Sequence, residues 1–221
     1  MKTNINITID GGAGVGKGTI TKLLAQKIGL QPIDSGAMYR VCSYLCNKEL
    51  IEPQDVTPEF LNRHEFSYKE FRLHIDEIFV EELPIRTQLN SNLSSKYATQ
   101  KVVREFVTQS TQKIMENKGF ILEGRDSGTV VCPSAEIKLY IESPIEIRAQ
   151  RRLQDYKKQG LLFTQEEIIQ ELEERDHQDK TRELDPLTIP KNALMISNGD
   201  LPIDELIESI ATRIKEVLSK K

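Results

Sequence analysis

The chain carries one glycine-rich stretch that decides its fold: Gly11-Gly12-Ala13-Gly14-Val15-Gly16-Lys17-Gly18-Thr19. The residues before it, Ile5 to Ile9, alternate between apolar and polar side chains, which predicts a strand. The residues after it place apolar side chains at helical spacing until Gly29, which predicts a helix. A glycine-rich turn between a strand and a helix is the context that the phosphate-binding motif G-x-x-x-x-G-K requires.

Each residue type in this stretch suits the binding of phosphate. Glycine permits positive φ and lets the backbone approach a phosphate closely. Successive N–H groups at the helix start form an anion nest, and Lys17 supplies an ammonium for the β- and γ-phosphates. The alternative, a glycine turn with a solvated lysine, stays open at this point.

The residue after the lysine is Gly18, where most phosphate loops have the Ser or Thr that binds magnesium. Thr19 comes one residue later and is expected to face an α-phosphate. We therefore expect Mg²⁺ as a cofactor held mainly by nucleotide phosphates and water, without a dedicated protein metal site. Asp10 and Asp126 are the acidic residues that could assist.

Strands and helices alternate along the rest of the chain. Apolar runs predict further strands at Leu30–Ile33, Phe120–Leu122, Ile137–Ile141 and Ala193–Ser197. Helical patterns lie between them, one of them over about Ile85–Ser95. This order predicts an α/β fold, a doubly wound parallel sheet with helices on both faces. The pattern changes over Phe66–Val80, where two or three short antiparallel strands are expected.

We expect residues 1–221 to form a single domain of three parts. The core comprises about 1–51, 91–149 and 183–221, and an insertion with a small sheet spans about 52–90. A helical lid spans about 150–182, of which residues 150–165, with Gly160, are expected to move.

Composition narrows the class of protein. A net charge of −4 argues against a general nucleic-acid-binding protein. No run of 18 apolar residues occurs, so a membrane-spanning helix is not expected. The three cysteines form no C-x-x-C pair, which favours reduced, buried thiols in a cytoplasmic protein. No surplus apolar helix face stands out, so a monomer is expected.

Three further segments carry candidate site residues, each with a plainer alternative. Ser35 and Arg40 could clamp a second phosphate at a helix start, or Asp34-Ser35-Gly36 could simply cap that helix. Arg125-Asp126 follows a predicted strand, where ligands bind in open α/β sheets, or forms a structural ion pair.

The third segment is a charged stretch from Gln165 to Arg182 that predicts one helix or a helix pair. Its Arg175, Asp179 and Arg182 share one helix face, which an ordinary solvated helix would also explain. His177 in the same stretch is interpreted as an exposed neighbour. Three arginines of the preceding helix are candidates for the site or ordinary surface charges: Arg148, Arg151 and Arg152.

Together these segments resemble the bacterial cytidylate kinases, a family of nucleoside-monophosphate kinases. The resemblance rests on these stretches, in the family's order over nearly the whole chain: I-D-G-G-A-G-V-G-K-G-T, D-S-G-A-M-Y-R, I-R-T, E-G-R-D-S-G-T-V-V, R-A-Q-R-R and E-R-D-H-Q-D-K-T-R. The long insertion fits this family too. Four positions depart from its usual pattern: Gly12 for proline, Ser127 for an apolar residue, Cys132 for an aromatic one and Gln178 for arginine.

The resemblance implies transfer of a phosphoryl group from ATP to CMP or dCMP. It implies that Gly11 through Thr19 hold ATP, and that these residues are catalytic: Lys17, Arg125, Arg151 and Arg175. The residues implied to bind CMP are Ser35, Arg40, Ser95, Arg104, Arg125, Asp126, Arg175, Asp179 and Arg182. Among them Asp126 would accept from the cytosine N4 amino group, while Arg104 and Ser95 would donate to N3 or O2.

Two alternatives to this function stay open. One is a kinase for another small acceptor: UMP, AMP, dTMP or shikimate. The other is a non-catalytic nucleotide-binding switch, although no N-K-x-D guanine motif is present.

Overall fold

The computed structural model describes residues 4–69, 72–199 and 201–219. The chain forms two compact units, which are described separately: residues 1–32 with 119–221, and residues 33–118. No helix among the described residues is long and apolar enough to cross a membrane.

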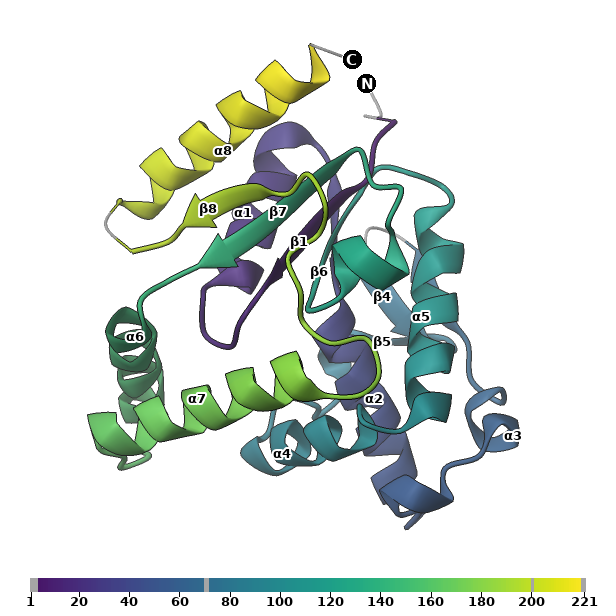
Figure 1. The fold of residues 1–221 in the computed structure, drawn as a ribbon. Coiled ribbons are helices and arrows are strands. Elements are labelled where there is room, and N and C mark those ends of the chain that lie inside the picture. The colour runs from purple at the N-terminus through teal and green to yellow at the C-terminus, as the bar shows by residue number, and fades with distance from the viewer. Residues whose placement is uncertain (1–3, 70–71, 200, 220–221) are drawn as a thin grey trace. The chain divides into compact units, whose positions relative to one another are not determined.

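A five-stranded sheet organises the first unit, in the order β2-β6-β1-β7-β8 (Figure 1). Its strands are β1 (Ile7–Gly11), β2 (Gln31–Asp34, whose first two residues belong to this unit), β6 (Phe120–Gly124), β7 (Ile137–Glu142) and β8 (Leu194–Ser197). The central strand β1 pairs in parallel with β6 and β7, so that Ile7 lies between Ile121 and Ile137. Strand β8 pairs in parallel with β7.

Two long helices cover one face of this sheet: α1 (Lys17–Ile28) and α8 (Ile203–Leu218). Ile7 and Ile9 of β1 are fully buried in the core cluster with Ile20 of α1 and Ile210 of α8. Thr8 and Asp10 alternate with these isoleucines and point to the other face, where a one-turn π-helix, η3 (Ser127–Val131), contacts β1. The alternation in the sequence therefore separates an apolar face from a polar one.

Helices α6 (Ile145–Lys158) and α7 (Gln165–Thr181) form a hairpin after β7 (Figure 1). Thr164 begins α7 with a capping box, in which its hydroxyl accepts from the Glu167 N–H and the Glu167 carboxylate accepts from the Thr164 N–H. The hairpin has its own small core, and Ala13 of the glycine-rich loop belongs to it. The glycine-rich loop is thus packed against the hairpin.

The second unit combines helices with a small antiparallel sheet, β3-β4-β5. Its helices are α2 (Ser35–Lys48), α3 (Pro58–Leu61), α4 (Gln88–Tyr97) and α5 (Lys101–Met115), with short 3₁₀ turns η1 (Pro53–Asp55) and η2 (Val80–Glu82). The strands are β3 (Phe66–Lys69), β4 (Arg72–Ile75) and β5 (Ile78–Phe79). Helix α2 packs against α4 and α5, and α5 packs against β3.

The parallel α/β sheet with a separate antiparallel sheet confirms the predicted fold class. The small sheet falls within the predicted insertion, and the charged stretch forms a single helix, α7. One helix start differs from the expected spacing over Ile85–Ser95: α4 begins at Gln88 because the Thr87 hydroxyl caps it by accepting from the Asn90 N–H. The three cysteines are free and buried, as the sequence predicts.

Candidate active site

The glycine-rich loop connects β1 to α1 and ends in a left-handed glycine. Gly14 and Gly16 have φ values of 70° and 89°, which residues with a Cβ adopt only at a cost in conformational energy. Gly16 is also the N-cap of α1, and its carbonyl accepts from the Ile20 N–H at 3.1 Å. The helix N-terminus therefore directs its first N–H groups into the loop, which is the geometry of an anion site.

Lys17 is buried and curls back over this loop. Its Nζ donates to the carbonyls of Gly11 at 2.8 Å and Gly12 at 2.6 Å. Burial lowers the pKa of Lys17 well below its usual range, and the positive charge of Arg125 lowers it further, while Glu123 acts in the opposite direction. An incoming phosphate would replace the two carbonyls as the partner of this ammonium.

Asp10 holds the turn after β6 in place. Its two carboxylate oxygens accept from the N–H groups of Ser127 and Gly128, both at 2.8 Å. Burial raises the pKa of the Asp10 carboxyl, although these backbone hydrogen bonds lower it. Both oxygens thus already have partners within the protein.

Four charged side chains meet where β6 ends and α7 ends. Arg125 Nε donates to Asp179 Oδ2 at 2.7 Å, and Arg182 Nη1 lies 3.5 Å from Asp179 Oδ1. Arg182 Nη2 also lies 3.4 Å from Asp126 Oδ1. These ion pairs also bring the candidate ligand-binding residues together. The cluster is therefore compatible with both alternatives suggested by the sequence, a structural ion pair and a ligand site.

The electrostatics of this cluster favour anions. Burial alone would raise the pKa of the Asp179 carboxyl, but the guanidinium of Arg125 and its hydrogen bond, with Arg175 and Arg182, hold it below its usual range. Asp179 is therefore ionised among three arginines. Arg125 and Arg175 also act on Lys17, so that the cluster and the loop share one electrostatic field.

Arg151 of α6 lies beside the loop, with Nη1 4.0 Å from where a Cβ would be at Gly16. Its Nη1 donates to the Asn198 carbonyl at 3.3 Å, and its Nη2 donates to the Asn198 side-chain oxygen at 3.5 Å. Asn198 is buried and donates through Nδ2 to the Val15 carbonyl at 2.8 Å. One side chain thus connects Arg151 to the backbone of the loop.

Several residues at the loop were not singled out from the sequence. Asp176, Glu123 and Asn198 all contact it or face it, yet each comes from a distant element. Arg148 was predicted to be either a site residue or an ordinary surface charge; it is buried and donates to the Ala13 carbonyl.

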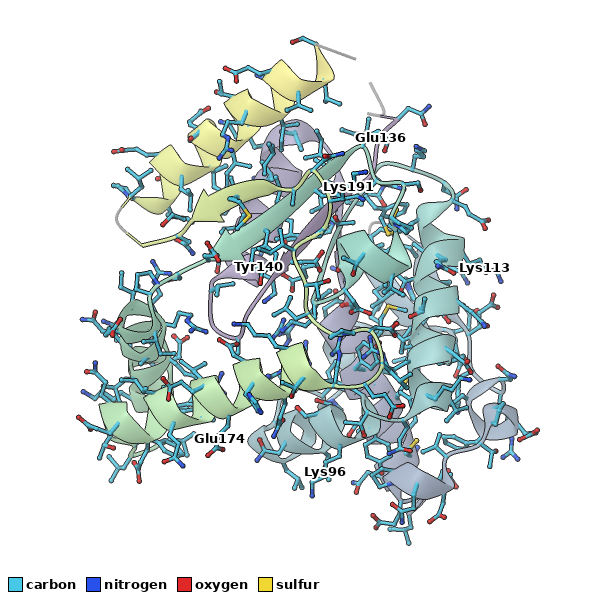
Figure 2. All side chains as sticks on the ribbon, viewed as in Figure 1. Lys96, Lys113, Glu136, Tyr140, Glu174 and Lys191 are labelled. Atoms are coloured by element: carbon cyan, nitrogen blue, oxygen red, sulfur yellow. The ribbon has the colours of Figure 1, made fainter. Side chains whose placement is uncertain are left out.

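Arg152 instead pairs with Glu171 at 2.6 Å, and His177 is exposed as predicted. Figure 2 shows the side chains of α7, with Glu174 labelled on it.

The remaining candidate residues lie in the second unit. Asp34 is the N-cap of α2 and accepts from the Ala37 N–H at 2.9 Å. Arg40 donates to the same carboxylate at 2.7 Å, and Arg86 lies 3.3 Å from it. The capping interpretation of this segment is thus confirmed, and the two arginines lie at the capping carboxylate of Asp34, while Ser35 is buried.

Two residues proposed to read a base also belong to this unit. Arg104 of α5 is buried, donates to the Ala98 carbonyl at 3.3 Å and places its guanidinium 5.6 Å from the centre of the Tyr39 ring. Ser95 lies half-buried on α4. Both are held on helices, which limits their motion.

The acidic residues fit a magnesium ion that phosphates and water hold for the most part. Among the described residues, no group of three or more His, Cys, Asp or Glu side chains could hold a metal ion. Asp10 has both oxygens engaged, and Asp126 lies against Arg182. Glu123 faces the loop, with Oε1 3.5 Å from where a Cβ would lie at Gly18.

Comparisons with known proteins agree with the family that the sequence motifs resemble. A family model described as "Cytidylate kinase" matches residues 7–216. A "Cytidylate kinase" of Fervidobacterium nodosum is 36% identical over 95% of this chain and 96% of its own length. A second, of Thermosipho africanus, is 39% identical over 95% of this chain and 94% of its own length. A solved structure of an uncharacterized protein from Eubacterium ventriosum shares the fold, with a TM-score of 0.57 and 13% identity over 97% of this chain and 99% of that one.

Proposed function

The chain belongs to the cytidylate kinase family and is an ATP-dependent kinase of CMP and dCMP, and we propose here which of its residues carry the reaction. The reaction moves the γ-phosphoryl group of ATP to a phosphate oxygen of CMP or dCMP and yields ADP with CDP or dCDP. No covalent intermediate on the protein is required, since the acceptor oxygen attacks directly. The protein contributes alignment and charge stabilisation.

The donor site is the loop from Gly11 to Thr19. Its N–H groups and the ammonium of Lys17 bind the ATP phosphates, with Thr19 at the α-phosphate. One observation carries this assignment: the buried Lys17 places its Nζ over the loop, 2.8 Å from the Gly11 carbonyl and 2.6 Å from the Gly12 carbonyl. The positive charges of Arg125 and Arg175 also act on Lys17, and positive charge is what a phosphoryl group in transfer requires.

The residues that we assign to the acceptor are those implied by the family motifs: Ser35, Arg40, Ser95, Arg104, Arg125, Asp126, Arg175, Asp179 and Arg182. Four of them are assigned to the acceptor α-phosphate: Ser35, Arg40, Arg125 and Arg175. Asp179 and Arg182 are assigned to the sugar and the neighbouring phosphate. Asp126 accepts from the cytosine N4 amino group, and Arg104 and Ser95 donate to the ring.

Arg151 completes the catalytic set from the α6 side. Its anchorage on Asn198, whose side chain also binds the Val15 carbonyl, supports a position beside the ATP phosphates. Residues 150–165 of the hairpin, which include Arg151, act as a mobile lid in this assignment, which would exclude water and suppress ATP hydrolysis.

Mg²⁺, when bound, supplies neutralising charge on the phosphates of the nucleotide. We assign Glu123 as the carboxylate that holds it through water, because Asp10 is engaged at both oxygens. We also propose that the enzyme works as a cytoplasmic monomer; its free, buried cysteines agree with a reducing compartment. Light scattering after size-exclusion chromatography measures the mass, and about twice the chain mass of 25.3 kDa would contradict the monomer.

A coupled ADP-release assay with ATP and Mg²⁺ tests the proposal, with CMP, dCMP, UMP, AMP and dTMP offered separately. We expect turnover to be highest with CMP and dCMP. Another preferred acceptor would keep the kinase but reject the roles of Ser95, Arg104 and Asp126. ATP binding without turnover on any acceptor would favour a binding protein instead.

A further inference from the structure

Two side chains of the α6–α7 hairpin hold the backbone of Ala13 in the phosphate loop. Asp176 Oδ1 accepts from the Ala13 N–H at 2.7 Å, and Arg148 Nη1 donates to the Ala13 carbonyl at 2.9 Å. The same Nη1 also donates to Asp176 Oδ2 at 2.6 Å. These three contacts close a ring through one residue of the loop. One is the ion pair between Arg148 and Asp176, and the other two each join a charged side chain to a peptide group, so all three are charge-assisted and strong.

The methyl group of Ala13 is held from the same direction. It belongs to the core cluster of the hairpin, together with Ala149 of α6 and Leu172 of α7. Leu172 also lies 3.3 Å from where a Cβ would be at Gly14. The side chain and both peptide groups of Ala13 are therefore set by the hairpin rather than by the loop itself.

The neighbouring glycine makes this contact possible. A Cβ at Gly12 would lie 2.7 Å from Asp176 Oδ1, closer than real Cβ contacts, and 3.0 Å from Oδ2, which is tighter than most of them. The Asp176 carboxylate cannot swing away without breaking its bonds to Ala13 and Arg148. The Asp176 carboxylate can therefore occupy this position because Gly12 has no side chain.

We propose that Asp176 is a positioning residue for the ATP phosphates, which acts with Arg148 by fixing the Ala13 peptides, and that Gly12 provides the space for it. Converging N–H groups bind phosphate only when they are held in the correct direction, and a small misplacement weakens binding strongly. The inference rests on the proposed function only in that the loop binds ATP. It does not depend on the acceptor.

The first experiment measures ATP binding calorimetrically with no acceptor present. Asp176→Ala is expected to weaken binding about tenfold, because hydrogen bonds of this charged kind contribute that much. Asp176→Asn keeps an acceptor for the Ala13 N–H but places an amide against Arg148, so we expect an intermediate loss. Glu174→Gln, an exposed carboxylate on the same helix, is the matched control and is expected to change binding less than about twofold.

Steady-state kinetics separate positioning from general damage to the fold. The KM for ATP is expected to rise about tenfold in Asp176→Ala, while the KM for CMP at saturating ATP stays within about twofold. Equal rises in both values, or unchanged ATP binding in a folded variant, would overturn the proposal. If the wild type binds ATP but does not phosphorylate CMP, the proposed function fails while the binding comparison still tests Asp176.

A double-mutant cycle tests the role of Gly12. Gly12→Ala alone is expected to weaken ATP binding about tenfold, since its Cβ would displace the carboxylate. In the Asp176→Ala background the same substitution is expected to cost less than about twofold, because the carboxylate is gone. Additive losses would contradict the proposal. Should Asp176→Ala not fold, Asp176→Ser, which also removes the carboxylate, serves as the background, and additivity there has the same meaning.

Discussion

The Arg125 Nε–H donates to Asp179 Oδ2 across 2.7 Å and so joins the residue after β6 to the last turn of α7. The two side chains are 19% and 17% exposed, so water competes little with the contact. Arg182 approaches the other carboxylate oxygen of Asp179. One carboxylate thus orders two of the arginines assigned to the acceptor.

Replacing Asp179 by asparagine is expected to weaken the acceptor site. The substitution keeps the size of the side chain but removes the charge that holds Arg125, so the KM for CMP should rise about tenfold and unfolding should become easier by about 1–3 kcal/mol. Steady-state kinetics and urea unfolding measure the two effects. The exposed Asp155 of α6 offers the control Asp155→Asn, and equal behaviour of the two variants would contradict the assignment.

The same carboxyl makes stability depend on pH in the acid range. Its pKa is lower in the folded chain than in the unfolded one, so its contribution is fully present above the unfolded pKa, which is about 3.9. The contribution is lost as the pH falls through the folded pKa. We expect the difference in unfolding free energy between the wild type and Asp179→Asn to be constant from about pH 7 to pH 5 and to shrink below about pH 4. A difference that grows on acidification would show the opposite sign.

Lys17 is expected to trade stability for activity. A buried ammonium with a lowered pKa destabilises the folded chain at neutral pH, because its charge is better solvated in the unfolded state. Lys17→Met should therefore raise the melting temperature, by roughly 2–4 °C for each kcal/mol gained. Turnover should fall by about a thousandfold or more, since the charge on the phosphates is no longer met. A lower melting temperature would contradict this prediction. It would mean that the two hydrogen bonds from Lys17 to Gly11 and Gly12 stabilise the folded chain by more than the burial of the charge destabilises it.

Asp126 is expected to determine the choice of base. Asp126→Asn removes the carboxylate that accepts from the N4 amino group, and kcat/KM for CMP should fall about 10- to 100-fold. The value for UMP should change much less, because its O4 faces an amide N–H in the variant. The ratio of the two values, measured in one assay, is the readout. Equal losses for CMP and UMP would assign Asp126 to structure, through its contact with Arg182, instead of to the base.

Local patterns predicted much of the fold. The alternating strand, the glycine turn and the apolar positions of α1 lie within one contiguous segment, so the element order and the loop could be read directly. The π-helix η3 was missed, because Asp10 stabilises it by accepting from Ser127 and Gly128 more than a hundred residues away. The start of α4 was placed too early, since a single hydroxyl, that of Thr87, decides it.

Candidate site residues divide in the same way. Lys17, Arg125 and Asp179 could be chosen because motif, strand end and helix face are all local features. The pattern left Arg148 undecided between a surface charge and a site residue, and it did not mark Asp176, because a charged residue on a helix has the same spacing whether it meets water or a buried partner.

The residues from Ile5 to Gly29 were thus enough to specify a strand, an anion-binding turn and a helix, because each feature depends on neighbours in the chain. The tertiary fold alone brought Asp176 and Asn198 to that turn, across 163 and 183 residues of sequence. Hydrogen bonds over such separations leave no periodic trace in the sequence. They arise only when the sheet and the α6–α7 hairpin have packed and water has been excluded from their partners.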